Sequence, residues 1–323
     1  MREIIIDKNE SDQRLDRFLK KYLAEAPQGF IYKMLRKKNI KVNDAKAQPE
    51  TTIYEGDKVQ LYLSDETIDK FIAQKEEVKS KLIPNIIYED DNIILINKPV
   101  GILSHGASGE FEENIVDSMI SYLIQKGDFV PRIEKTFTPS ICNRLDRNTS
   151  GIIIGAKNYQ SLKAINEAIK SGNIRRFYKT IVKGNIKKEF TAEGYLSKDE
   201  DKNRVTVHED DSEGSKKITT VIKPLKNNNG YSLLEIELIT GRTHQIRGHL
   251  SSLGYPVIGD RKYGNREINK RFNEKYSLDN QWLHGYRIEF HGLQGEFQYL
   301  NDKSFVSEVA GKEKDIEKDL FEF

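Results

Sequence analysis

The sequence has little cysteine and no long hydrophobic run, and both absences restrict its class. A single cysteine, Cys142, excludes an intrachain disulfide and a structural zinc site of the usual multi-cysteine type. The apolar run at residues 4–6 is too short for the core of a signal peptide. No apolar stretch approaches the roughly 20 residues of a membrane-spanning helix. We therefore expect a soluble, cytoplasmic protein.

An excess of either charge is also missing. The chain has 323 residues, of which 52 are Lys or Arg and 50 are Asp or Glu, so its net charge is only +2. The overall balance predicts no particular partner, and charge has to be considered locally. Hydrophobic residues make up 37% of the chain, which is enough for a sizeable core, and the length suggests about two domains.

Two helices and a few short strands are expected near the N-terminus. Apolar residues at helical spacing predict a helix over 13–24, capped by Asp12, and a second helix over 28–38. Alternating apolar residues predict strands at 40–42 and 59–63. The chain is accordingly divided into a small domain at 1–63, a linker at 64–83, a large domain at 84–300, and a charged tail at 301–323 that we expect to be loosely ordered.

The large domain mixes strands and helices without a regular strand–helix–strand alternation. This pattern is typical of an α+β fold with a mixed, mostly antiparallel sheet. One helix is expected from about residue 242 to 253, with Thr240 as its N-cap and Gly254 just after its end. On that helix, Thr243 and Arg247 would share a face, as would His244 and Arg247.

Positive charge gathers between Arg14 and Lys46, where ten Lys or Arg stand against three acids. Such a face is either solvated or binds a phosphate backbone, and composition leaves both interpretations open. The stretches 14–19, 40–43 and 55–59 resemble the small RNA-binding domain that is named after a protein of the small ribosomal subunit. The resemblance favours structured RNA as the partner. The expected RNA contacts in this unit are Arg14, Arg17, Lys33, Arg36, Lys37 and Lys38.

One carboxylate, Asp146, lies between Arg144 and Arg147 in the polar stretch Asn-Arg-Leu-Asp-Arg-Asn-Thr-Ser-Gly at 143–151, just before a predicted buried strand. Neighbouring cations favour the ionised form of a carboxylate, and an ionised, oriented carboxylate can serve as a nucleophile or a base. The alternative is an aspartate that only ties down a turn. The residues alone leave both interpretations open.

Two further stretches combine cations with imidazole or aromatic groups. The sequence Thr-Gly-Arg-Thr-His-Gln-Ile-Arg at 240–247 suits an anionic substrate, or is simply a solvated helix face. Tyr178 follows two arginines on a predicted strand, so it either stacks on a base or packs within the sheet. His244 and His249 are five residues apart and do not share a helical face, so we expect no metal site.

The order and spacing of these stretches resemble those of the RluA-type pseudouridine synthases, from about residue 85 to 292. The resemblance implies an enzyme that isomerises uridine to pseudouridine in RNA. The matching segments are Tyr-Glu-Asp-Asp-Asn at 88–92, Asn-Lys-Pro-Val-Gly at 97–101, Arg-Leu-Asp-Arg-Asn-Thr-Ser-Gly at 144–151, Tyr178-Lys179, Gly-Arg-Thr-His-Gln-Ile-Arg at 241–247, the segment 256–264, and Leu283-His284.

Site residues follow from the resemblance. It implies Asp146 as the catalytic aspartate, Tyr178 as an active-site tyrosine stacked on the uracil, and Arg247 as the cation that pairs with the aspartate. Arg144 would hold or replace an extruded uridine. Family members commonly carry His at the position of Asn143, a difference expected to affect how the loop is held rather than the reaction. The remaining expected RNA contacts are Arg147, Arg242 and His244.

The implied reaction breaks the N1–C1′ bond, turns the uracil and joins C5 to C1′, so no redox step and no cofactor is expected. The uridine must first be flipped out of its stack. Asp146 would act as a nucleophile at the sugar or as a base that removes a sugar proton, and the sequence leaves both open. Large-subunit ribosomal RNA is the expected substrate, because family members with such an N-terminal unit mostly modify it, and we expect a monomer.

Two other classes compete with this interpretation. An RNA-binding protein without catalysis would keep the basic face but would form no product. A metal-dependent nuclease would need several clustered acids, and the two candidates, Asp90-Asp91 and Asp210-Asp211, are typical of turns.

Overall fold

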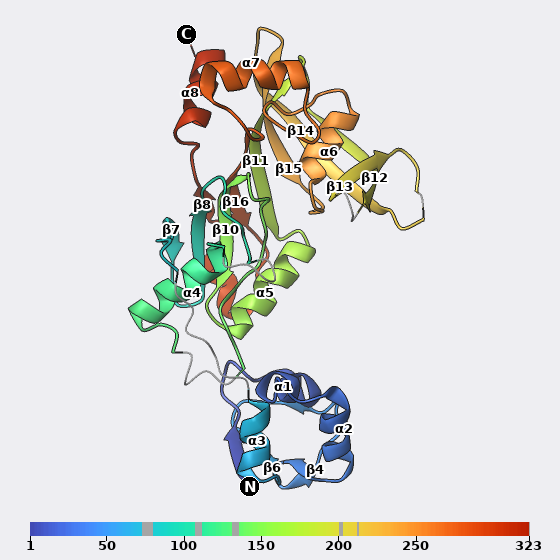
Figure 1. Ribbon diagram of the computed structural model, residues 1–323, viewed down its shortest axis with the longest axis vertical. Coiled ribbons are helices and arrows are strands. Elements are labelled where there is room, and N and C mark those ends of the chain that lie inside the picture. The colour runs from blue at the N-terminus through green and yellow to red at the C-terminus, as the bar shows by residue number, and fades with distance from the viewer. Residues whose placement is uncertain (73–79, 107–111, 131–135, 200–202, 212, 323) are drawn as a thin grey trace.

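The computed structural model describes residues 1–72, 80–106, 112–130, 136–199, 203–211 and 213–322. They form a small N-terminal unit at one end of the long axis and a larger unit that carries the C-terminus at the other end (Figure 1). Both units contain helices and strands, and the large sheet is mostly antiparallel, as the sequence predicted.

The small unit has a hydrophobic core of its own, which extends from Ile4 to Ile68. Its four-stranded sheet has the order β1-β6-β3-β4, and β2 pairs separately with β5. Its elements are β1 (Arg2–Ile5), β2 (Gln13–Arg14), α1 (Leu15–Tyr22), α2 (Gln28–Arg36), β3 (Ile40–Val42), β4 (Ala45–Lys46), β5 (Thr52–Ile53), β6 (Lys58–Leu61) and α3 (Asp65–Phe71).

The small unit continues beyond the predicted boundary at residue 63. Ser64 caps α3 by accepting a hydrogen bond from the Thr67 amide, and Ile68 of this helix is fully buried in the core. The predicted cap of the first helix is wrong, because Asp12 has a positive φ and α1 begins only at Leu15. The segment 64–72 is therefore a packed part of the small unit rather than a linker.

An eleven-stranded sheet forms the centre of the large unit. Its strand order is β13-β12-β14-β15-β11-β16-β10-β8-β7, with β17 added beside β16 and β9 beside β10. The strands are β7 (Ile86–Glu89), β8 (Ile93–Lys98), β9 (Ser140–Ile141), β10 (Ser150–Ala156), β11 (Ile174–Lys183), β12 (Phe190–Asp199), β13 (Arg204–His208), β14 (Lys216–Asn228), β15 (Tyr231–Leu238), β16 (Leu283–Phe290) and β17 (Ser304–Val306).

Helices cover both faces of this sheet. The alternation of side chains along β10 sends Ile153 into the cluster of α4 and Ile152 into the cluster of α5. Both faces are buried there, which accounts for the apolar run Ile152-Ile153-Ile154 within β10. The helices are α4 (Ile115–Lys126), α5 (Tyr159–Lys170), α6 (Gln245–Ser252), α7 (Arg266–Tyr276), the short 3₁₀ helix η1 (Gly295–Leu300) and α8 (Lys312–Phe321).

The C-terminal segment is ordered, so the prediction of a loosely ordered tail is wrong. β17 pairs with β16. Ile316 and Phe321 of α8 are buried in one cluster with Trp282, whose indole N–H donates to the Glu313 carbonyl oxygen at 2.9 Å. Charged residues alternate with these apolar ones along the helix, so composition alone could not reveal its apolar side.

A single parallel pair joins the two halves of the large sheet among the strands that the structure describes. Ser150 and Gly151 of β10 pair with His284 and Gly285 of β16. The backbones approach so closely that a Cβ on Gly151 would lie 2.2 Å from the Gly285 carbonyl oxygen, and Gly151 has a φ of +120°. Only glycine fits this position without displacing a strand.

The two units touch where the turn before β2 meets α5. The Tyr159 amide donates to Asn9 Oδ1 at 3.3 Å, and Lys163 forms an ion pair with Asp12. Glu10 is fully buried in this junction, and its Oε1 accepts a hydrogen bond from the Thr136 amide at 3.3 Å.

The large unit begins before the predicted boundary at residue 84. Ser118 Oγ donates to the Leu82 carbonyl oxygen at 2.7 Å, and the Lys81 amide donates to Glu113 at 3.0 Å. A chain of residues 80–323 should therefore unfold cooperatively and be about 1–2 kcal/mol more stable than one of residues 84–323, which lacks these bonds and the half-buried Leu82. Urea unfolding of both chains measures the difference, and equal stability would contradict this boundary.

Candidate active site

The loop that carries Asp146 is held on both sides of that residue. The side-chain amide of Asn143 donates to the Ile152 carbonyl oxygen at 3.2 Å and accepts from the Ile154 amide at 2.8 Å. Leu145 is held by Ser104, whose hydroxyl donates to the Leu145 carbonyl oxygen at 2.7 Å and accepts from its amide at 3.0 Å. Asn143 thus ties the loop to β10, in line with the expectation that this residue affects how the loop is held.

Lys98 secures the next part of the loop from within the core. Its fully buried ammonium group donates to the carbonyl oxygens of Arg147, Pro99 and Ile102 at 2.9, 3.0 and 2.7 Å. Burial lowers the pKa of Lys98 to about 7. The Gly101 amide also donates to the Arg147 carbonyl oxygen at 2.9 Å. The backbone around Asp146 is therefore fixed, while its carboxylate is about one-quarter exposed.

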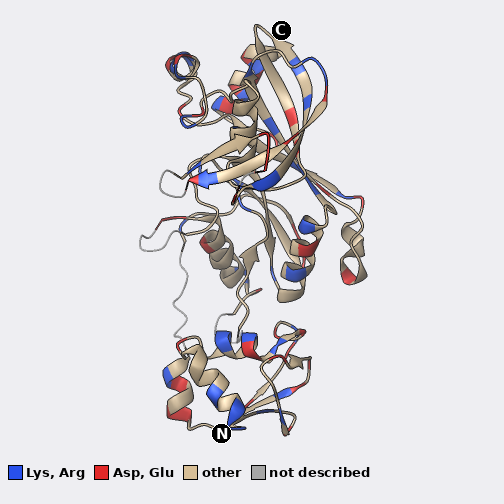
Figure 2. Cartoon of the chain, turned by 90° about the vertical axis from the view of Figure 1, so that its right-hand side faces the viewer, with Lys and Arg blue, Asp and Glu red and all other residues tan. Residues whose placement is uncertain are grey.

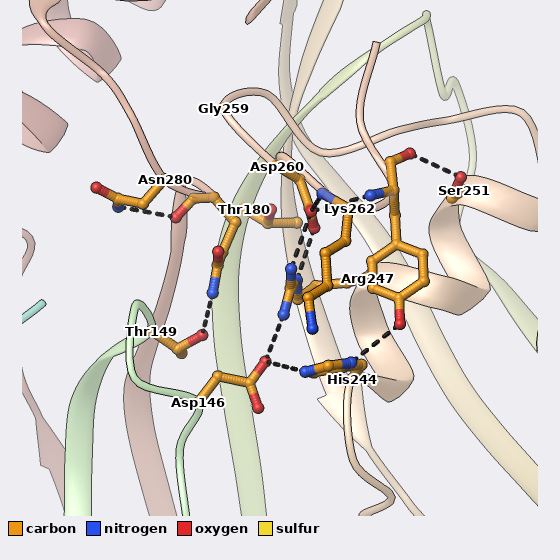
Figure 3. Close-up of polar contacts among 12 residues, drawn as sticks. Asp146, Thr149, Thr180, His244, Arg247, Ser251, Gly259, Asp260, Lys262 and Asn280 are labelled. Atoms are coloured by element: carbon orange, nitrogen blue, oxygen red, sulfur yellow. Dashed lines mark hydrogen bonds and ion pairs between the residues drawn. The ribbon is translucent and has the colours of Figure 1, made fainter. Parts of the chain in front are cut away.

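The predicted ion pair between Asp146 and Arg247 is present. Arg247 Nη1 donates to Asp146 Oδ2 at 2.8 Å, across 101 residues of sequence. The other edge of the same guanidinium group binds Asp260, with Nε 2.6 Å from Oδ2 and Nη2 2.9 Å from Oδ1. Figure 3 shows Arg247 between the two carboxylates, with Asp260 above it and Asp146 below it.

Asp260 fixes the orientation of Arg247 because it is itself fully buried and hydrogen-bonded. Its Oδ1 also accepts from the amides of Lys262 and Tyr263 at 2.8 and 3.0 Å. Burial alone would raise the pKa of Asp260, but its bonds with Arg247 and these amides hold the pKa below its usual value. Burial alone would lower the pKa of Arg247, but Asp260 and Asp146 raise it overall, so Arg247 remains charged.

His244 reaches the same carboxylate from the start of α6. The helix begins at Gln245, and His244 is its N-cap residue, so the predicted start at 242 and the predicted cap at Thr240 are wrong. Thr240 Oγ1 instead donates to Gln245 Oε1 at 3.0 Å. His244 Nε2 lies 3.8 Å from Asp146 Oδ2. The predicted sharing of a helical face by Thr243 and Arg247 fails, because Thr243 precedes the helix.

Tyr178 lies beside the loop but is nearly covered. Only 6% of the residue is exposed, and burial raises the pKa of its hydroxyl. A bulge between Phe177 and Tyr178 brings Tyr178 opposite Gly285 of β16. The approach is close, because a Cβ added to Gly285 would lie 3.3 Å from the tyrosine ring. Asp146 is close enough to act electrostatically on the Tyr178 hydroxyl, and the role of Tyr178 as an active-site residue stacked on uracil stays a prediction.

The other arginines of the predicted site differ in their surroundings. Arg147 is paired with Glu112 through two hydrogen bonds of 3.1 and 2.7 Å, so its charge is already compensated. Arg144 and Arg242 are exposed, and the structure gives their guanidinium groups no ion-pair partner within the described ranges. They are the more suitable of the three for contacting RNA.

The predicted cations of the small unit are also not equivalent. Arg14 pairs with Asp16 and Glu50 at 2.8 and 3.4 Å. Figure 2 shows Lys and Arg along the helices of this unit, with Asp and Glu mixed among them. The predicted contacts that are exposed and have no ion pair with another described residue are Arg17, Lys33, Arg36, Lys37 and Lys38.

Some features of the site had no assigned role in the sequence. Asp260 and Lys98 lie in segments that carried the resemblance. Nothing in the local sequence indicates that Asp260 binds Arg247, 13 residues before it, or that Lys98 binds the backbone of Arg147, 49 residues after it. Within the described residues, no group of three or more His, Cys, Asp or Glu could hold a metal ion. The helices found there include none that is long and apolar enough to span a membrane.

Comparison with known proteins gives a consistent result. The sequence model of a family described as RNA pseudouridylate synthase matches residues 92–252. A protein of Rickettsia felis named ribosomal large subunit pseudouridine synthase C is 36% identical over 279 residues, which cover 82% of this chain and 86% of the relative. A protein of Haemophilus influenzae with the same name is 30% identical and matches 92% of this chain and 90% of its own length.

A solved structure supports the fold. The human RNA pseudouridylate synthase domain containing 4 superposes with a TM-score of 0.54 at 20% sequence identity. The match covers 70% of this chain and 88% of the human chain.

Replacing Asp260 with Asn should lower the free energy of unfolding by about 3 kcal/mol at neutral pH, because Arg247 would be left without a buried charge partner. The folded pKa of Asp260 lies below the roughly 3.9 of an unfolded aspartate. Its contribution to stability is therefore complete above that pH and is lost as the pH falls through the lowered pKa. Urea unfolding at several pH values should show a constant difference from the wild type near neutrality that shrinks in acid.

Asp302→Asn is the control for this measurement, since the Asp302 side chain is 94% exposed and the change should have little effect on stability. An Asp260→Asn variant as stable as the wild type at pH 7 would contradict the argument. The argument would also be contradicted if the difference in unfolding free energy between the variant and the wild type were as large below pH 3 as at pH 7.

Proposed function

This chain belongs to the RNA pseudouridylate synthase family, and we propose that it converts specific uridines of large-subunit ribosomal RNA to pseudouridine with Asp146 as the catalytic carboxylate. The observation that carries the assignment of Asp146 is its setting. It stands on a loop whose backbone is hydrogen-bonded on both sides, and one of its oxygens is bound by Arg247 at 2.8 Å. A partly exposed carboxylate held in this way is suited to act on a bound sugar.

The choice of ribosomal RNA rests on two observations. The relatives from Rickettsia felis and Haemophilus influenzae are named for the large ribosomal subunit and match this chain over most of its length. In addition, the small unit presents exposed cations that have no ion pair with another described residue, which suits an extended phosphate backbone. The alternative of a catalytically silent RNA-binding protein has no support from these relatives.

The geometry divides the work of the reaction among a few residues. The target uridine is flipped out of its stack, and its ribose comes to Asp146. Asp146 either attacks C1′ or removes the proton on C2′, and the N1–C1′ bond breaks in both cases. The uracil turns and C5 bonds to C1′, which releases Asp146 from C1′ in the first case and is accompanied by return of the proton to C2′ in the second. The proton on C5 is then lost, and N1 takes up a proton. Throughout, Arg247 holds Asp146 in place and balances its charge.

Tyr178 and Arg144 complete the proposed site. Tyr178 lies against the Gly285 backbone beside Asp146, where its ring can form a wall of the uracil pocket. Arg144 is exposed two residues before Asp146 and is free to enter the space that the flipped base leaves. These roles agree with the structure of the loop. Hydrogen bonds hold the backbone of Leu145 and of Arg147, whereas the side chain of Arg144 is exposed to solvent.

Deleting the gene should remove a small set of pseudouridines from large-subunit ribosomal RNA, and restoring the wild-type gene should bring them back. Asp146→Asn should not restore them, although its RNA affinity should stay within a few-fold of the wild type, because the amide cannot act as a nucleophile or base. Asp302→Asn should restore them fully. Sequencing of chemically marked pseudouridines provides the measurement. Loss confined to transfer RNA would refute the substrate, and activity of Asp146→Asn would refute the catalytic assignment.

The cations of α2 and of the residue after it should contribute to RNA affinity through phosphate contacts. Replacing Arg36 and Lys37 together with Gln should weaken binding and reduce the slope of log K against log salt by about 0.9 for each phosphate that is no longer neutralised. The matched control replaces Lys187 and Lys188, an exposed adjacent pair in the large unit. Binding titrations at several salt concentrations test this, and an equal change in both double variants would contradict a special role for the small unit.

A further inference from the structure

His244 has a backbone conformation that is uncommon for a residue with a side chain. At the N-cap of α6 it has a φ of 53° and a ψ of 16°, in the left-handed region. Residues other than glycine remain there only when surrounding contacts hold them, and such positions gather at functional sites. Figure 3 shows the imidazole ring of His244 directed toward Asp146.

Tyr263 determines which nitrogen of His244 carries the proton. The Val205 amide donates to the Tyr263 hydroxyl oxygen at 2.8 Å, so that oxygen already acts as an acceptor. His244 Nδ1 lies 2.9 Å from the same oxygen. The Tyr263 hydroxyl has one hydrogen to donate. If Nδ1 carried the proton, that hydrogen would have no acceptor, so every polar group is paired only when Tyr263 donates to Nδ1. A neutral His244 then carries its proton on Nε2.

The environment of His244 favours this neutral form. Burial lowers the pKa of the imidazole. Several charged groups face it from neighbouring elements: Asp146 on the loop before β10, Arg247 on α6, and Asp260 and Lys262 on the segment that follows α6. The cations Arg247 and Lys262 offset the two carboxylates, so no net attraction forces a second proton onto the ring.

The Nε2–H group is therefore directed at Asp146 but is not bonded to it. The 3.8 Å between Nε2 and Asp146 Oδ2 is too long for a hydrogen bond. A single hydroxyl group can lie within hydrogen-bond distance of both atoms, accepting from Nε2–H and donating to the carboxylate. The pair forms a site for one hydroxyl at the position where the reacting sugar must come.

We propose that His244 binds the 2′-hydroxyl of the target ribose and thereby selects RNA at the reacting nucleotide, with Tyr263 as the residue that positions it. The inference rests on the proposed function. Asp146 acts on C1′ or on the proton of C2′, and the 2′-hydroxyl is attached to C2′. It is therefore the hydroxyl group nearest to the carboxylate in both versions of the reaction. The 2′-hydroxyl is also the group that distinguishes RNA from DNA.

Three variants separate this contact from a structural role. His244→Asn keeps an acceptor for the Tyr263 hydroxyl and suits the left-handed backbone, but it removes the Nε2 donor. His244→Gln can place an amide N–H near the former position of Nε2 and should recover part of the contact. Tyr263→Phe keeps the imidazole but removes the donor that fixes its proton on Nε2, so it should weaken the same contact indirectly.

The test uses a synthetic RNA hairpin with one mapped target uridine and the same hairpin with 2′-deoxyuridine at that position only. The quantity measured is the ratio of kcat/KM for the two hairpins, or of inhibition constants if the deoxy hairpin does not react. The wild type should prefer the ribose hairpin, and His244→Asn should reduce this preference about tenfold, the usual value of one hydrogen bond to a buried group. Tyr263→Phe and His244→Gln should lie between the two.

Several results would overturn the inference. A preference that is the same in His244→Asn as in the wild type, or equal losses on both hairpins, would mean that the imidazole does not contact the 2′-hydroxyl. The same conclusion would follow if the wild type had equal kcat/KM values for the ribose and the deoxy hairpin. Failure of the proposed function looks different, because the wild type would then form no pseudouridine in the ribose hairpin.

Discussion

The site depends on one guanidinium group that is shared between two carboxylates. Arg247 is buried, and it can remain so only because Asp260 binds one of its edges inside the protein. The other edge is left to hold Asp146. Asp260 in turn is fixed by two backbone amides, so it sets the orientation of Arg247, while Asn143, Ser104 and Lys98 hold the backbone around Asp146. This chain of contacts links the loop before β10, helix α6 and the segment after it into one rigid site.

Much of this arrangement could be predicted from the sequence. The family resemblance implied the ion pair between Asp146 and Arg247, and the mixture of strands and helices without regular alternation indicated an α+β fold with a mostly antiparallel sheet. The basic faces of the first two helices were correctly placed as well, since Arg17 and Lys37 are exposed. The fold class and the basic faces are local or repeated patterns, which a single sequence records well, whereas the ion pair spans 101 residues and was reached only through the resemblance.

The remaining features depend on contacts between distant segments. Asp260 shows no local sign of its role, because only the fold brings it against Arg247. The left-handed conformation of His244 is imposed by its surroundings, and a helical spacing pattern would have predicted an ordinary helix start. Charge hid the apolar side of α8, as it hid Ile68 of α3. In each case a tertiary contact outweighed the local preference of the residues.

The site is assembled from segments that are far apart in the order of synthesis. Asp146 belongs to the half of the sheet that contains β10, whereas Arg247 and Asp260 come about one hundred residues later. A nascent chain on the ribosome therefore carries an incomplete centre until residue 260 has emerged, and the strand that joins the halves, β16, emerges later still. With Asp146 in the role proposed for it, the centre can act only after most of the chain has been made, although the basic N-terminal unit is complete early and emerges beside ribosomal RNA.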